Sequence, residues 1–136
     1  MYLNKNSSRR EVLGYIEIYS LSFLYDFSDE PWAQSYIDVS AKIALNKNSI
    51  GFLLYFSNKS WAKPYLDEAA KRAAKSDSYS FLLNFLDKVW AKPYLDEAVK
   101  EVVKKYPEYF LEHWADRFPH AINLALFELG SENVYR

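Results

Sequence analysis

The chain has 136 residues, of which 50% are hydrophobic and 26% charged, and its formal net charge is −1. This composition excludes a disordered chain and gives no basic surface for a nucleic-acid backbone. With no cysteine, the chain has no disulfide, no thiolate metal site and no thiol nucleophile. Only three residues are glycine, which favours helices over strands joined by tight turns.

The first predicted element is a helix over residues 9–27. Ser8 and Glu11 have the spacing of a capping box in front of the apolar residue Val12. Two arginines followed by an apolar stretch resemble a secretory signal, but Glu17 interrupts the stretch and no small-residue cleavage site follows. No run of about 20 apolar residues is present, so we expect neither a membrane span nor a membrane partner, and we expect a cytoplasmic location.

From residue 19 onward the chain is a tandem repeat with a period of 29 residues. Residues 48–76 and 77–105 agree at 17 of 29 positions without a gap. Residues 19–47 form a more diverged copy, and residues 106–129 keep only the first half of the unit, with Pro119 at the position of the repeated Trp. The repeat predicts one helical-repeat domain over residues 1–136.

Each copy contains two predicted helices. The first carries an aromatic stripe at helical spacing, and Asp77 is expected to cap this helix in the third copy. A short polar residue then recurs in register and marks the turn between the helices. The stripe consists of Phe23, Phe52, Phe81 and Phe110, followed four residues later by Phe27, Phe56, Phe85 and Trp114; the turn residues are Asp29, Asn58, Asp87 and Asp116.

The second helix of each copy begins near a Trp-Ala pair and a proline. Pro64 and Pro93 fit only in a first helical turn, and Trp61 and Trp90 are expected in the core. Pro107 is expected to open the seventh helix of the chain and Gly130 to end the eighth. After the first helix, the predicted helices cover residues 31–46, 49–57, 61–75, 78–86, 90–105, 107–117 and 119–129.

The recurrent aromatic–Ala–Pro–Tyr–Leu block and the alternation of shorter and longer helices resemble the helical-hairpin solenoids, a class that includes tetratricopeptide, HEAT and armadillo arrays. The period of 29 residues differs from the roughly 34 of tetratricopeptide repeats, and the Trp opens the second helix instead of the first. The resemblance implies an all-α fold, a right-handed α-solenoid of about four stacked hairpins, and a binding or scaffolding surface.

Two groups of residues are of the types used in acid–base catalysis or metal binding. The acidic pairs Asp67-Glu68 and Asp96-Glu97 are typical of solvated charge at helix starts, and we assign them no acid–base role. His113 and His120 flank a predicted helix break, which removes the single-face geometry of a paired metal site. No nucleophile elbow, phosphate loop or metal-ligand motif is present. We therefore expect no enzyme activity, cofactor or bound metal.

One column of the first helices changes its chemistry at every copy: Asp26, Tyr55, Asn84 and His113. Ser22, Ser80 and Tyr109 lie one helical turn earlier, together with Gly51. Repeat proteins hold their packing positions and vary those that face a ligand, although an exposed position also drifts without function. The leading hypothesis is a non-catalytic scaffold that binds a protein or peptide on this column. The alternatives are a self-associating structural unit and a small enzyme with an unrecognised site.

Overall fold

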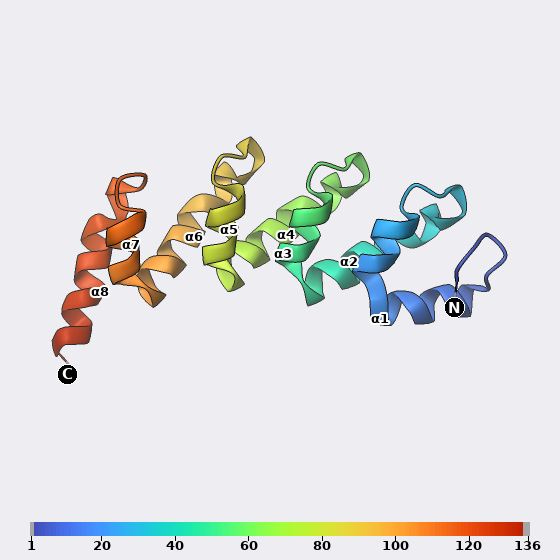
Figure 1. Ribbon diagram of the computed structural model, residues 1–136, viewed down its shortest axis with the longest axis horizontal. Helices are drawn as coiled ribbons and strands as arrows, with labels where there is room; N and C mark the ends of the chain where they lie inside the picture. Colours follow the sequence, from blue (N-terminus) through green and yellow to red (C-terminus); the bar gives the residue numbers. More distant parts are fainter. Residues whose placement is uncertain (1, 135–136) are drawn as a thin grey trace. The chain divides into compact units, whose positions relative to one another are not determined.

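The computed structural model describes residues 2–134, with side chains through residue 130. All regular elements in this part of the chain are helical, which confirms the all-α class (Figure 1). The chain divides into two compact units, residues 1–70 and residues 71–136. In the first unit α2 packs against α1 and α3, and in the second α6 packs against α5, α7 and α8.

The observed elements follow the predicted map closely. In chain order they are α1 (Arg9–Phe27), η1 (Pro31–Tyr36), α2 (Ile37–Lys47), α3 (Ser49–Phe56), η2 (Ser60–Ala62), α4 (Lys63–Ser76), α5 (Ser78–Phe85), η3 (Val89–Ala91), α6 (Lys92–Lys105), α7 (Pro107–His113), η4 (Pro119–Ala121) and α8 (Ile122–Val134).

Each second helix begins with a short 3-10 segment, and the α-helix proper starts after it. Pro64 and Pro93 are the second residues of α4 and α6, as predicted, and Pro107 opens α7. The expected turns are also present: backbone hydrogen bonds from Glu30 to Phe27 and from Lys88 to Phe85 close them at 2.9 and 3.0 Å.

Two predicted helix ends are wrong. The seventh helix ends at His113 instead of residue 117. The backbone forms a turn from Trp114, in which the Arg117 amide donates a hydrogen bond to the Trp114 carbonyl. The eighth helix does not end at Gly130 but continues to Val134. Gly130 has no positive φ, so it does not adopt the left-handed conformation that makes glycine a helix terminator.

The first helix is not continuous. Tyr19 has φ −124° and ψ 45°, and α1 bends there (Figure 1). The residues 29 positions apart that precede the later first helices have similar non-helical conformations: Asn48, Asp77 and Tyr106. Residues 9–18 therefore occupy the place that the second helix of a preceding copy would take.

Burial supports this assignment of residues 9–18. Val12 and Ile16 are fully buried, as are Val99 and Val103 at the equivalent positions of α6. Two backbone carbonyls beside the bend accept hydrogen bonds from α2: Glu17 from the Lys47 ammonium, and Ser20 from the Ser40 hydroxyl at 3.1 Å. The bend is thus fixed by packing against α2.

The helix N-termini are capped in different ways. Ser8 and Glu11 form the predicted capping box, and their hydrogen bonds lower the pKa of Glu11. The Asn48 side chain accepts from the Gly51 amide at 2.9 Å. Asp77 makes no such bond, so the predicted cap is wrong. A Cβ on Gly51 would lie 2.6 Å from the side-chain nitrogen of Asn48. In the third copy, where Asp77 forms no cap, Ser80 carries a Cβ at the position of Gly51.

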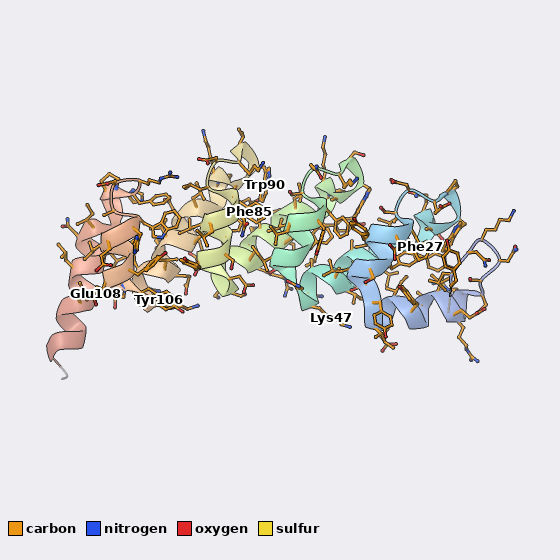
Figure 2. All side chains as sticks on the ribbon, in the orientation of Figure 1. Phe27, Lys47, Phe85, Trp90, Tyr106 and Glu108 are labelled. Atoms are coloured by element: carbon orange, nitrogen blue, oxygen red, sulfur yellow. The ribbon has the colours of Figure 1, made fainter. Side chains whose placement is uncertain are left out.

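The aromatic stripe supplies the largest fully buried side chains of the core. Phe23, Phe52, Phe81 and Phe110 are all fully buried. In the second unit Phe85 contacts Trp90 with ring centroids 5.0 Å apart, beside the turn that joins α5 to α6 (Figure 2). Trp61 and Trp90 are themselves half-buried, and the alanine after each of them is fully buried.

In the first unit, residues before α1 complete the core. Leu3 is 1% exposed and packs in one cluster with the buried side chains Val12, Ile16, Phe23 and Phe27. The Tyr2 ring meets Phe27 edge-on at 6.2 Å. The segment before Ser8 therefore covers one end of the aromatic stripe, a role that the sequence did not indicate.

A candidate binding surface on the first helices

In the first unit, exposed aromatic and aliphatic side chains gather where the last turns of α1 lie near α3. Tyr25 is 70% exposed, Leu54 52% and Tyr55 57%. The Tyr25 and Tyr55 rings meet edge to face, with centroids 5.9 Å apart. We call this group, together with Ser22 and Asp26, the tyrosine-pair surface.

The tyrosine-pair surface is hollowed. A cavity of about 500 Å³ is lined by Leu21, Ser22, Tyr25, Asp26, Asn48 and Tyr55. Three of these residues, Ser22, Asp26 and Tyr55, belong to the set predicted from the sequence. A pocket of this volume is within the range of small-ligand sites, which runs from about 300 to 1,000 Å³.

Asp26 supplies the negative charge of this hollow. Within the described residues, its carboxylate forms no ion pair and accepts no hydrogen bond from a side chain. It also lines a second hollow, of about 310 Å³, with Tyr2, Leu3, Tyr15 and Phe27. There, burial and the Asp26 charge raise the pKa of Tyr15, in that order of importance.

In the second unit, the predicted residues form two separate local groups. The Asn84 side-chain amide donates to the Ser80 carbonyl at 2.8 Å, so these two belong to α5 alone. On α7 the Tyr109 and His113 rings lie 4.2 Å apart. The Tyr109 hydroxyl is 2.8 Å from that of Tyr79, and this hydrogen bond raises the pKa of Tyr109.

The tyrosines of the second unit line a shallow hollow of their own. Its volume is about 310 Å³, and its walls are Tyr79, Tyr106 and Tyr109. No acidic side chain contributes to these walls. Chemically it therefore differs from the hollow beside Asp26.

One exposed column on the first helices was not predicted from the sequence. Tyr25, Leu54 and Leu83 occupy equivalent positions, and all three are more than half exposed. In the Phe-Leu-Leu triplet of α3, the first Leu lies beside the buried stripe, whereas the second is two residues after the Phe and points away from the stripe. The helical period was sufficient to separate the two leucines.

Gly51, predicted together with Ser22, Ser80 and Tyr109 one turn before the variable column, does not lie on the surface. It is buried, and its space is filled by the Asn48 cap. The sequence-predicted ladder of surface positions is therefore interrupted in the second copy one turn before Tyr55.

The acidic residues at the helix starts make hydrogen bonds and ion pairs. Asp38 accepts a hydrogen bond from the Tyr65 hydroxyl at 2.8 Å and pairs with Lys42 at 3.1 Å, which together lower the pKa of Asp38. Burial and the bond to Asp38 raise the pKa of Tyr65 to about 12. In the second unit the His120 imidazole lies 3.4 Å from the Asp96 carboxylate.

Among the described residues, no three His, Asp or Glu side chains are grouped closely enough to hold a metal ion. Over the same part of the chain, no helix is both long and apolar enough to cross a membrane. Comparison of the sequence with known protein families finds no match, and neither a curated protein nor a solved structure shows significant similarity.

Proposed function

We propose that the chain is a non-catalytic interaction scaffold whose first helices bind a protein or peptide segment. In this proposal the copies stack as an α-solenoid resembling tetratricopeptide and HEAT-type arrays, and their outer first-helix positions form the binding surface. The observation that carries the proposal is the set of exposed large apolar side chains at equivalent positions of α1, α3 and α5: Tyr25, Leu54 and Leu83.

Exposed apolar side chains at equivalent helix positions favour binding over drift. Scattered single hydrophobic residues are normal on a protein surface and need no explanation. Here they recur at one position of the repeat, and in the first unit Tyr25 borders a hollow that contains a carboxylate. Rigid aromatic side chains with a polar neighbour are typical of protein-binding surfaces.

Selection from a random peptide display library on the immobilised chain tests this function. Selected peptides should lose binding to Leu54→Ser and Tyr55→Ala variants. They should keep binding to Lys104→Ser, which changes an exposed residue on a second helix. Selected peptides that bind all three variants equally would place the binding surface elsewhere and refute the proposal.

A second candidate function is self-association through α8. Leu126 and Phe127 are 53% and 68% exposed on this helix. The corresponding positions of α6 are Asp96 and Glu97, because the fourth copy contains one additional residue before α8. We propose that this apolar pair binds a second copy of the chain.

Light scattering after size exclusion separates the two functions. Self-association predicts a mass that rises with concentration in the wild-type chain. It predicts a constant monomer mass in the double variant Leu126→Asp, Phe127→Glu, which restores the acidic pattern of α6. The matched control Leu83→Glu should behave as wild type. A wild-type monomer at all concentrations would remove this candidate and leave the first untouched.

A further inference from the structure

We propose that the tyrosine-pair surface recognises a cationic side chain, arginine or lysine, of a bound peptide segment. This inference rests on the proposed binding function and assigns the chemistry of its partner. It draws on the aromatic pair, the carboxylate beside it and the hollow that both border.

The aromatic part of the argument concerns Tyr25 and Tyr55. Their edge-to-face arrangement, with an interplanar angle of 75°, leaves ring faces open to solvent on both side chains. A guanidinium or ammonium group gains electrostatic attraction over such a face, and a planar guanidinium also stacks on it. The same unit already uses this contact, since the Arg9 guanidinium lies 5.9 Å from the centroid of the Tyr36 ring.

The electrostatic part of the argument concerns Asp26. Among the six residues that line the hollow it is the one charged side chain, and no Lys or Arg of the lining neutralises it. A ligand cation in the hollow would be attracted to this carboxylate, and a charge-assisted hydrogen bond is roughly twice as strong as a neutral one. An anionic or purely apolar ligand would leave the carboxylate unpaired.

The second unit of the chain serves as an internal comparison. At the positions equivalent to Tyr25 and Asp26, α5 carries Leu83 and Asn84, which lack both the ring and the charge. The tyrosine hollow of the second unit has no acidic wall. A neighbouring hollow of about 480 Å³ contains Glu108 and Glu112, but Lys105 also lines it and supplies a positive charge of its own. Cation recognition is therefore expected on the first unit alone.

Amide NMR of the full chain tests this inference with three blocked heptapeptides. Each has a single central residue between Gly-Ser segments: arginine, its neutral isostere citrulline, or leucine. The arginine peptide, added to millimolar concentrations, should give saturable shifts at the amides of Tyr25, Asp26 and Tyr55. The amides of Leu83 and Asn84 should stay unchanged, and citrulline should bind at least roughly fivefold more weakly.

Two variants decide the assignment. Asp26→Asn keeps the size of the side chain and should weaken arginine binding roughly fivefold, and raising the salt concentration should weaken wild-type binding in the same direction. Asn84→Asp, the matched change in the second unit, adds a carboxylate without the tyrosine pair and should not create a site. Equal binding of the arginine and citrulline peptides would overturn the inference. So would amide shifts that rise linearly with peptide concentration, without saturation, and are spread over all acidic residues.

The leucine peptide and the display selection keep the two proposals distinguishable. If selected or leucine peptides bind through Leu54 and Tyr55 while arginine peptides do not, the cation assignment fails and the binding function stands. If neither class shifts the first-helix amides, both fail.

Discussion

Replacing Phe52 with alanine is the most direct test of the repeated aromatic core. Phe52 is fully buried, and its ring lies 5.5 Å from Phe56, 6.1 Å from Trp61 and 6.4 Å from Tyr65 between centroids. Truncation removes the transfer free energy of the ring, leaves a cavity and ends three T-shaped contacts. We expect the free energy of unfolding to fall by about 3–5 kcal/mol.

The matched control is Leu54→Ala, two residues further along the same helix. Its side chain is more than half exposed, so its removal should change the free energy of unfolding by no more than about 0.5 kcal/mol. Both variants are measured by urea unfolding followed by far-UV circular dichroism, with wild type in parallel. The reasoning is refuted if Phe52→Ala costs less than about 1 kcal/mol, or if Leu54→Ala costs as much as Phe52→Ala.

Three further predictions concern helix caps, glycines and titration. Gly14→Ala should raise the free energy of unfolding by about 0.5–1 kcal/mol, because a Cβ there meets nothing within 4 Å, whereas Gly51→Ala displaces a capping side chain and should give no gain in the same urea assay. Ser8→Ala should cost about 1 kcal/mol by thermal melting; no loss would mean that the capping box does not stabilise α1. Because the pKa of Tyr65 is raised to about 12, its contribution to stability is complete below pH 10 and is lost as the pH rises towards 12. Asp38→Asn should lower the pKa of Tyr65, measured by NMR of labelled tyrosine, and an unchanged value would contradict the assigned hydrogen bond.

Much of the helix map could be predicted because local chemistry and packing agree in the internal copies. The prolines at the starts of α4, α6 and α7, and the Ser8 capping box, have purely local causes. The buried aromatic stripe was visible as a helical period. Periodicity also sufficed to place Asp26 and Tyr55 on the surface, although it gave no sign that the Tyr25 ring meets the Tyr55 ring edge to face.

The bend at Tyr19 could not be predicted from local preferences. Tyrosine has no turn tendency, and residues 9–27 contain no proline, so a continuous helix was the natural expectation. The non-helical conformation is imposed by packing, since Ser40 and Lys47 of α2 bond to carbonyls on either side of it. Aligning Val12 and Ile16 with buried positions of the later second helices would have indicated the bend, but the sequence similarity there is too low to notice.

The fourth copy shows why register alone mislocates a diverged repeat. Backbone bonds from Ala33, Ala62 and Ala91 recur every 29 residues, whereas the equivalent bond from Ala121 comes 30 residues after the last of these. His120, not Pro119, therefore takes the place of the repeated Trp.

The additional residue changes which rings fill the core. It brings Phe118, 7% exposed, to a position held in the third copy by the exposed Lys88. Phe118 packs edge-on against His120 at 6.1 Å, and Trp114 replaces the smaller Phe of the other copies. In the fourth copy the Trp therefore comes before the Phe, the reverse of the order of Phe85 and Trp90 in the third copy. The smaller imidazole of His120 lies at the start of the second helix. Cores tolerate such exchanges when total volume is kept, so the insertion and the loss of the Trp compensate each other.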